Sequence, residues 1–269
     1  MSQPKATGNV TFNGVAYHCS LCKAGYACDG IGLSNVTSVC SGGYWCAIGA
    51  PSNHPVCSDA SCTPMYGICP LGHYCPLETS TPMLCATGTF MNHTGASVCS
   101  SCPAGYYCDS SYSTSTYRSC PQGYYCPQGT GANWLQCPVG TFGGRLNLQS
   151  SLDCSICTAG SYCGTATLIA PTASCSAGYY CPPGSQDSHG KTSTSSSHVC
   201  PPGSYCPTGS GLPLACVPGT FNNATGKTSI TECTDCTRGS YCGTYNLTHP
   251  TGYCSAVYYC IGGSNVSNP

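Results

Sequence analysis

Apolar residues never recur at helical spacing over a long stretch of this sequence, because glycine, proline and cysteine interrupt the chain every few positions. No apolar period of about eight or more residues is left for an amphipathic helix. The pattern instead predicts many turns and short strands of about two to four residues. The most helix-like segment is GGRLNLQSSLDC, residues 143–154, where we expect a single helical turn.

The interruptions follow a repeated unit, C-x2-G-x2-C. It occurs ten times, starting at Cys22, Cys40, Cys69, Cys102, Cys120, Cys157, Cys175, Cys200, Cys236 and Cys254. Nine copies carry glycine at the fourth position, and Val257 replaces it in the last. A glycine fixed at one place in so short a loop predicts a positive φ angle, or a close approach that leaves no room for a Cβ atom. Val257 argues against the positive φ angle.

An aromatic residue precedes the closing cysteine in nine of these copies. The nine are Trp45, Tyr74, Tyr107, Tyr125, Tyr162, Tyr180, Tyr205, Tyr241 and Tyr259. Such a ring can pack against a disulfide while a tyrosine hydroxyl stays in water. The alternative is a row of exposed rings that stack on sugars or on a partner protein.

The cysteines also show a longer period. The spacing C-x2-C-x5-C-x11-C-x5-C begins at Cys19, Cys99, Cys154 and Cys233, so that a long, a short and a second long interval follow one another. Links with C-x2-G-T-F, at Cys85, Cys137 and Cys216, lie between these blocks and lack the closing cysteine. We interpret the chain as a tandem duplication of a unit with one long and one short module, and predict modules at 1–84, 85–136, 137–215 and 216–269.

Composition indicates how such a chain folds without a large apolar core. Cysteine supplies 29 of the 269 residues, above the roughly 8–10% that marks a disulfide scaffold. We expect covalent loops to supply the stability that burial supplies elsewhere. The expected fold is small and disulfide-rich, mostly loops with short β-hairpins, in an elongated tandem array of cysteine-rich modules.

Charge limits the choice of partners. Only 6% of the residues are charged, so we expect no basic face for nucleic acid. The segment also lacks a polybasic cluster and an apolar run long enough to span a bilayer, and we expect no membrane insertion within it.

Six Asn-x-Ser/Thr triplets are candidate N-glycosylation sites: Asn9, Asn35, Asn92, Asn223, Asn246 and Asn265. Together with the cysteine content they predict a secreted protein that acts outside the cell. The serine- and threonine-rich links are either O-glycosylated or plain flexible surface. The opening residues MSQPKATGNV contain no apolar signal segment, and we expect the chain to be a fragment or a processed piece.

We expect no enzyme activity, cofactor or metal. The CxxC pairs are far apart in the sequence and embedded in further cysteines, which disfavours a closed zinc site. The histidines form no HExxH motif, the acidic residues are not clustered, and no G-x-S-x-G elbow precedes a helix.

The segment CATGTFMNHTGASVCSSCPAGYYC, residues 85–108, resembles the ephrin-receptor-like cysteine-rich repeats, which are related to the cysteine-rich domain of tumour-necrosis-factor receptors. The likeness recurs as CPVGTF…CSICTAGSYC and CVPGTF…CTDCTRGSYC. It implies stacks of small hairpin and loop modules, which are used in receptor ectodomains, matrix proteins and surface proteins.

The resemblance also implies a disulfide pattern. One bridge would close each GTF link: Cys85 to Cys99, Cys137 to Cys154 and Cys216 to Cys233. Two interlocked bridges would follow in each module: Cys22 to Cys40, Cys28 to Cys46, Cys102 to Cys120, Cys108 to Cys126, Cys157 to Cys175, Cys163 to Cys181, Cys236 to Cys254 and Cys242 to Cys260. Cys19 is left over, either as a free thiol or bonded to a cysteine outside the chain.

Two functions fit the sequence. The first is a structural, glycosylated subunit of an extracellular filament, surface hair, coat or matrix, with the chain itself as partner in an end-to-end homopolymer. The second is a receptor or adhesion ectodomain that binds a protein or a glycan along its side.

Overall fold

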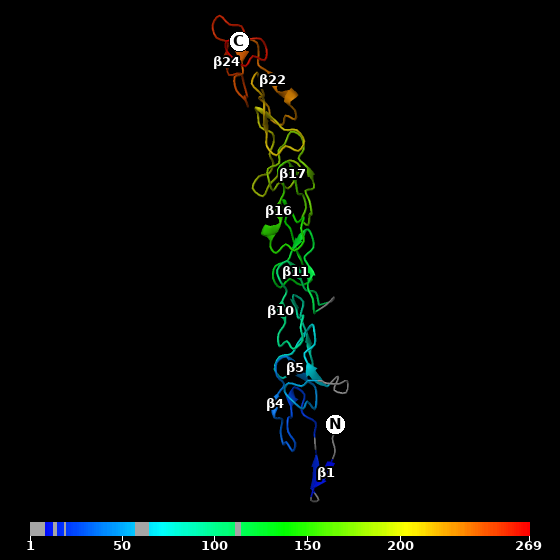
Figure 1. Cartoon of the computed structure of the whole chain (residues 1–269). Coiled ribbons are helices and arrows are strands. Elements are labelled where there is room, and N and C mark those ends of the chain that lie inside the picture. Colours follow the sequence, from blue (N-terminus) through cyan, green and yellow to red (C-terminus); the bar gives the residue numbers. More distant parts are fainter. Residues whose placement is uncertain (1–8, 13–14, 19, 57–64, 111–113) are drawn as a thin grey trace. The chain divides into compact units, whose positions relative to one another are not determined.

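The computed structural model describes residues 9–12, 15–18, 20–56, 65–110 and 114–269 (Figure 1). The described residues form twelve two-stranded antiparallel hairpins and two short 3-10 helices, with loops between them. The expected fold class, a disulfide-rich chain of loops and short hairpins in tandem, is confirmed. The relative placement of distant modules, and with it the expected elongation, stays a prediction.

The hairpins pair strands that follow one another in the sequence. They are β1 (Asn9–Phe12) with β2 (Val15–His18), β3 (Tyr26–Ala27) with β4 (Ser38–Val39), β5 (Tyr44–Cys46) with β6 (Tyr66–Ile68), β7 (His73–Tyr74) with β8 (Met83–Leu84), β9 (Thr89–Phe90) with β10 (Ser100–Ser101), β11 (Tyr106–Tyr107) with β12 (Arg118–Ser119), β13 (Tyr124–Tyr125) with β14 (Leu135–Gln136), β15 (Thr141–Phe142) with β16 (Ser155–Ile156), β17 (Ser161–Tyr162) with β18 (Ala173–Ser174), β19 (Ser204–Tyr205) with β20 (Leu214–Ala215), β21 (Thr220–Phe221) with β22 (Thr234–Asp235), and β23 (Ser240–Tyr241) with β24 (Gly252–Tyr253).

The 3-10 helices lie in equivalent places. Helix η1 (Ser151–Asp153) falls inside the segment 143–154, where one helical turn was expected, and η2 (Ile230–Glu232) ends just before Cys233 as η1 ends just before Cys154. Each helix stands at the end of the loop that follows a GTF turn.

The chain divides into two compact units. One comprises residues 1–120 and 126–134, and the other comprises residues 121–125 and 135–269. The finer division into four modules stays a prediction.

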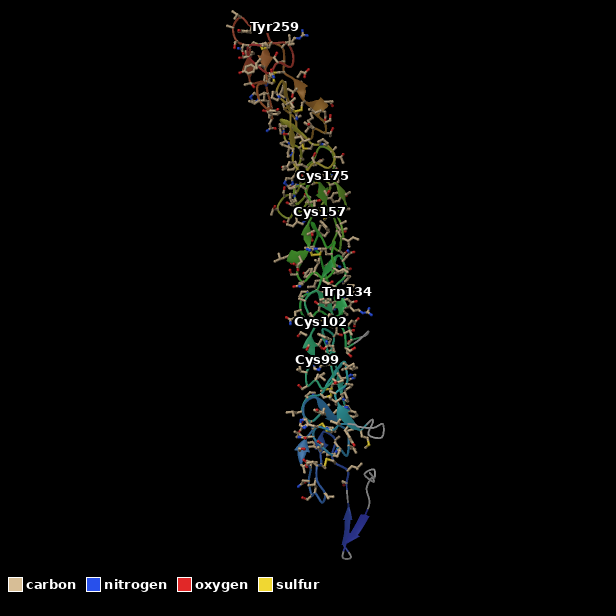
Figure 2. All side chains as sticks on the ribbon, in the orientation of Figure 1. Cys99, Cys102, Trp134, Cys157, Cys175 and Tyr259 are labelled. Atoms are coloured by element: carbon tan, nitrogen blue, oxygen red, sulfur yellow. A yellow bond between two sulfur atoms is a disulfide. The ribbon has the colours of Figure 1, made fainter. Side chains whose placement is uncertain are left out.

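Disulfides make up most of the interior of each unit (Figure 2). Thirteen bridges join described cysteines, and most of these cysteines are completely buried. Other buried apolar side chains among the described residues are few: Ala27, Ala50, Pro55, Phe90, Met91, Ala96 and Leu148. Sulfur therefore takes the place of an aliphatic core.

Three bridges close the loops after GTF turns: Cys85–Cys99, Cys137–Cys154 and Cys216–Cys233. These are the pairs that the family resemblance implied for the links. The other ten join cysteines six residues apart: Cys22–Cys28, Cys40–Cys46, Cys69–Cys75, Cys102–Cys108, Cys120–Cys126, Cys157–Cys163, Cys175–Cys181, Cys200–Cys206, Cys236–Cys242 and Cys254–Cys260.

The interlocked pairing is therefore wrong. It joined Cys22 to Cys40, Cys28 to Cys46, Cys102 to Cys120, Cys108 to Cys126, Cys157 to Cys175, Cys163 to Cys181, Cys236 to Cys254 and Cys242 to Cys260. The physical reason is the turn inside each C-x5-C segment, which reverses the chain and brings its own two cysteines to a Cα–Cα distance of 5.8–6.0 Å. That separation is the usual one for a disulfide.

Cys19, expected to be unpaired or bonded to a cysteine outside the chain, lies outside the described residues, and so do Cys57 and Cys62.

Candidate functional site

One turn, repeated thirteen times, is the main candidate for function. Each copy begins at the opening cysteine of a bridge, and we number the copies turn 1 to turn 13 from Cys22, Cys40, Cys69, Cys85, Cys102, Cys120, Cys137, Cys157, Cys175, Cys200, Cys216, Cys236 and Cys254. The residue three places later, which we call the turn residue, has a positive φ angle in every copy. The turn residue is glycine in turns 1–12 and valine in turn 13.

Valine at position 257 argues against a positive φ angle in the sequence, but the φ angle of Val257 is 70°. The GTF segments are also more than links between modules, because their glycines (Gly88, Gly140 and Gly219) have φ angles of 86–92° and occupy turns 4, 7 and 11. The GTF segment is thus the same turn with its closing cysteine moved into the following loop.

Backbone hydrogen bonds connect each turn to the next, and we call this series the turn ladder. The turn residue donates its N–H to the carbonyl of the residue that closes the next turn, six places after its opening cysteine. Gly160, for example, donates to the carbonyl of Cys181 at 2.9 Å. In return, the opening cysteine of the next turn donates to the carbonyl of the turn residue, as Cys175 does to Gly160 at 2.9 Å. The same pair of bonds repeats at every step from turn 1 to turn 13, with N···O distances of 2.7–3.1 Å.

A backbone carbonyl oxygen that follows the turn two places further along lies close to the turn residue, and this explains why the turn residue is glycine. A Cβ atom built on Gly140 of turn 7 would lie 2.7 Å from the carbonyl oxygen of Gly184, which follows turn 9. The same construction on Gly219 of turn 11 meets the carbonyl oxygen of Gly263 at 2.6 Å. Positive φ and close approach, which the sequence left as alternatives, therefore both hold at these positions.

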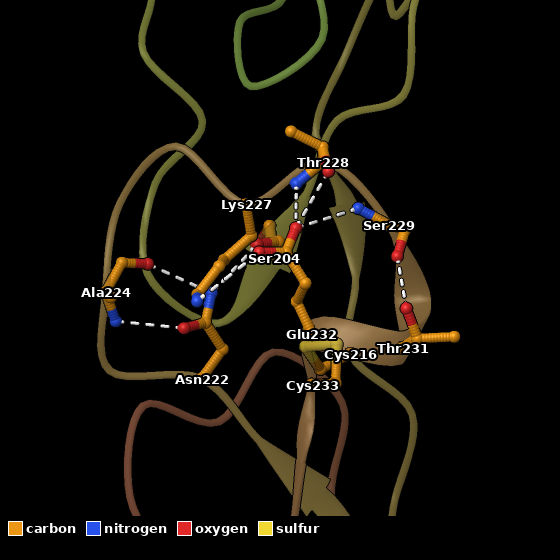
Figure 3. Close-up of polar contacts among 10 residues, drawn as sticks. All are labelled: Ser204, Cys216, Asn222, Ala224, Lys227, Thr228, Ser229, Thr231, Glu232 and Cys233. Carbon is orange, nitrogen blue, oxygen red and sulfur yellow. Dashed lines mark hydrogen bonds and ion pairs between the residues drawn. A yellow bond between two sulfur atoms is a disulfide. The ribbon is translucent and has the colours of Figure 1, made fainter.

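Turns 4, 7 and 11 keep the ladder although no cysteine closes them. Met91, Gly143 and Asn222 stand in the closing place, and their carbonyls accept the N–H of the preceding turn residue at 2.7–3.0 Å. Asn222 is only 3% exposed. Its Nδ2 donates to the carbonyls of Ser204 and Ala224, and its Oδ1 accepts the Ala224 N–H (Figure 3). The amide thus fixes turns 10 and 11 where a disulfide is missing.

Glu232 caps the loop that follows turn 11 (Figure 3). Its Oε2 accepts the N–H of Thr228 at 2.6 Å and the Thr228 hydroxyl at 2.8 Å, and Lys227 Nζ lies 3.5 Å from Oε1. The Thr228 N–H and hydroxyl, with smaller contributions from Ser229 and Lys227, lower the pKa of Glu232 from 4.5 to about 2. Asp153 holds the equivalent loop after turn 7 through the N–H groups of Gln149 and Ser150, which also lower the pKa of Asp153.

The aromatic residues that precede a closing cysteine are half-buried in turns 2, 3, 5, 6, 8, 9, 10 and 12. Tyr107 packs on Trp134 with a ring-centroid distance of 5.0 Å. Tyr259 of turn 13 differs, because 67% of its surface is exposed. Structural packing therefore accounts for most of this row, and Tyr259 alone matches the alternative of an exposed ring.

Ring contacts of two histidines repeat between the halves of the chain. His54 packs edge-on against Tyr44 at 5.0 Å, and His189 packs in the same way against Tyr179 at 4.4 Å. The interval between the two pairs equals the interval from Cys19 to Cys154, as tandem duplication requires. Among the described residues, no group of three or more histidine, cysteine, aspartate or glutamate side chains is placed to hold a metal ion.

The N-glycosylation candidates lie at the surface where the structure describes their side chains. Asn35, Asn92, Asn223, Asn246 and Asn265 are exposed, and Asn9 lies in strand β1. Asn92 and Asn223 hold equivalent positions, each directly after the residue that closes a GTF turn. Asn246 uses its Oδ1 to accept the Ser204 hydroxyl at 2.7 Å, so that its Nδ2 remains available for a sugar.

In the part of the chain that the structure describes, no helix is long and apolar enough to cross a membrane. No protein-family model and no curated protein matches the chain. Its character as a tandem cysteine-rich repeat protein therefore rests on its own bridges and turns. Such a density of disulfides is typical of proteins that act in an oxidising compartment outside the cell.

Proposed function

We propose that the chain is a structural, glycosylated subunit of an extracellular filament, surface hair, coat or matrix, assembled from copies of itself. The observation that carries the proposal is the turn ladder. The same backbone contacts repeat at every step from turn 1 to turn 13. A chain in which one structural device repeats from Cys22 to Cys260 suits a building material.

The surface is consistent with this role. With 6% charged residues the chain has little charge repulsion to keep copies apart. Exposed apolar side chains, among them Leu84, Ile156 and Leu214, accompany the hairpins. Sugars on the exposed asparagines would keep the remaining surface hydrated.

The oxidised cysteines support placement outside the cell. A loop of about 15 residues closed by a disulfide removes about 3 kcal/mol of unfolded-state entropy. Stability of this kind persists only where thiols stay oxidised. It also suits a material that has to last without turnover.

Electron microscopy of the native material tests the proposal. Antibodies raised against the loop 186–198 should label regular fibres or sheets at an axial repeat, because each copy presents that loop once. Preimmune serum and material reduced and alkylated in denaturant serve as controls. If the labelled protein is instead monodisperse or anchored singly at a cell surface, the structural role is wrong and the receptor or adhesion alternative takes its place.

A further inference from the structure

The loop that joins turn 9 to turn 10 is longer than the turn ladder requires. It comprises residues 182–199, twice as many as the loop that joins turn 10 to turn 11, residues 207–215. We call residues 182–199 the long loop. Loops of this length are uncommon in compact folds unless they have a function, and insertions between repeats often form a binding face.

Hydrogen bonds of its own fold the long loop. Asp187 Oδ1 accepts the N–H groups of His189 and Lys191 at 2.9 and 3.0 Å. The N–H of His198 donates to the carbonyl of His189 at 2.8 Å, and the His198 ring packs edge-on against Tyr180 at 5.1 Å. The long loop thus holds its side chains in a fixed arrangement beside the ladder.

The long loop and turn 7 enclose a groove, which we call the loop groove. Its volume of about 480 Å³ falls in the range of about 300–1,000 Å³ that is usual for small-molecule sites. Apolar side chains and uncharged polar ones line it together, among them Val139, Ile156, Pro182, Gln186, Ser193 and His198. A Cβ atom built on Gly140 would lie 3.4 Å from Cγ of Gln186, so this glutamine lies directly against turn 7.

Three polar groups in the loop groove have hydrogen-bonding capacity to spare. His198 Nδ1 lies 2.6 Å from the Gly190 carbonyl oxygen, which can only accept, so Nδ1 carries the proton and Nε2 of the neutral ring is an acceptor. Within the described part of the chain, this Nε2, the Gln186 amide and the Ser193 hydroxyl have no hydrogen-bond partner. An acceptor, an amide and a hydroxyl are best met by hydroxyl groups, which both donate and accept.

The loop groove is uncharged. Of the described residues that line it, none is lysine, arginine, aspartate or glutamate. Asp187 and Lys191 belong to the long loop but do not line the groove. A phosphate, sulfate or carboxylate group would lose its hydration there without meeting an opposite charge. The groove therefore suits a neutral ligand.

An equivalent recess lies one step along the ladder and shows what the long loop adds. It has a volume of about 450 Å³ between turn 8 and residues 207–215, and Ala159 and Leu214 are among its apolar walls. No amide or imidazole side chain is among the described residues that line it. Its Ser210 hydroxyl already donates to the Pro207 carbonyl at 2.7 Å. The ladder supplies the apolar walls in both places, and only the long loop supplies free polar groups.

We propose that the loop groove is a binding site for a neutral oligosaccharide. The apolar walls match the C–H face of a sugar ring, and Gln186, Ser193 and His198 match its hydroxyl groups. Such a ligand has two sources, the N-linked sugars of a second copy or a polysaccharide of the surroundings. The proposal goes beyond the proposed function, since the groove belongs to each single chain and needs no assembly.

An NMR titration of the intact chain tests the site. An endoglycosidase first trims each N-linked sugar to a single unit, so that the chain's own glycans do not compete. The probes are a high-mannose oligosaccharide of the N-linked type and a neutral glucan oligosaccharide. At least one probe should cause saturable shifts at the amides of Gln186 and Ser193 and at His198 Nε2. The probe that binds identifies the source of the ligand.

A double variant, Gln186→Ala with Ser193→Ala, should weaken this binding about tenfold or more, because two hydrogen bonds are lost. Thr208→Ala is the matched control. It removes an exposed hydroxyl from the equivalent recess and should bind as the wild type does. Amide signals outside the groove report whether each variant is folded. If the double variant misfolds, Ser193→Ala alone replaces it, because the Ser193 side chain is exposed.

The oligosaccharide site is refuted if neither probe shifts these signals, if loss of the groove side chains leaves the affinity unchanged, or if Thr208→Ala weakens binding equally. Tighter binding of a sulfated oligosaccharide than of its neutral counterpart would contradict the choice of a neutral ligand. Saturation by a neutral peptide rich in serine and proline, with no response to either sugar, would make the groove a protein-docking site instead. Sugar binding by a chain that never forms fibres counts against the proposed function alone.

Discussion

At the scale of single residues, the turn glycines meet two separate demands. Gly219 has a φ of 92°, and its Cα faces the carbonyl oxygen of Gly263, whereas Gly239 has a φ of 83° and open space at the Cβ position. The two positions share the turn and the ladder bonds but differ in close approach. They therefore allow the two demands to be measured apart.

We predict that Gly239→Ala lowers the free energy of unfolding by about 1–2 kcal/mol, the cost of a left-handed conformation for an L-residue. Gly219→Ala should lower it further, because the Gly263 carbonyl must also move. Denaturant unfolding with all disulfides intact, followed by tyrosine fluorescence, gives both values. Equal losses in the two variants would show that close approach contributes nothing.

The residue scale also shows what the sequence could predict. Nine glycines in register predicted a special turn conformation, and the positive φ angles follow from that pattern. The sequence could not predict that Val257 adopts the same angle, because local preference disfavours it and only the surrounding repeat imposes it. Nor could it reveal that Met91, Gly143 and Asn222 close turns, since three unlike side chains share only a backbone carbonyl.

At the scale of elements, the loop caps make stability depend on pH. The bonds from Thr228 favour the charged form of Glu232 and lower its pKa to about 2. A carboxyl group with a lowered folded-state pKa stabilises the fold above its unfolded pKa of 4.5, and this contribution is lost as the pH falls through about 2. The loop after turn 11 should thus stay capped at moderately acidic pH.

An NMR titration of the Thr228 amide tests this cap. The wild-type amide shift should move with a midpoint near pH 2, and the Glu232→Gln variant should show no such step. Because Gln keeps an acceptor oxygen but cannot ionise, it is the matched control. A wild-type midpoint near pH 4.5 would mean that the Thr228 bonds do not favour the carboxylate.

The bridges show where cysteine spacing stops being informative. The pattern C-x5-C-x11-C-x5-C allows pairing within each short segment or between the two, and spacing alone cannot choose between them. The choice depends on the turn at residues such as Gly105, which places Cys102 and Cys108 at 5.8 Å between Cα atoms. A fixed glycine between two cysteines is the local signal that favours pairing within the segment.

At the scale of the whole molecule, the bridges divide the chain into covalently separate stretches. With pairing inside each turn, no described disulfide spans the peptide bond after Arg118, since Cys102–Cys108 lies before it and Cys120–Cys126 after it. The interlocked alternative, with Cys102 to Cys120 and Cys108 to Cys126, would tie the two sides together twice. Arg118 is a site for trypsin, so the two patterns give different products.

We predict that trypsin, acting on unfolded but unreduced protein, separates the residues up to Arg118 from residues 119–191. Cleavage after Lys191, which no described disulfide spans, releases residues 192–269 as a further disulfide-bonded part. Arg145 provides the internal control, because Cys137–Cys154 spans it and must keep residues 119–145 attached to the peptide that follows. Mass spectrometry before and after reduction identifies both cases. Parts that stay joined across Arg118 until reduction would contradict pairing within the turns, and with it the geometry on which the turn ladder depends.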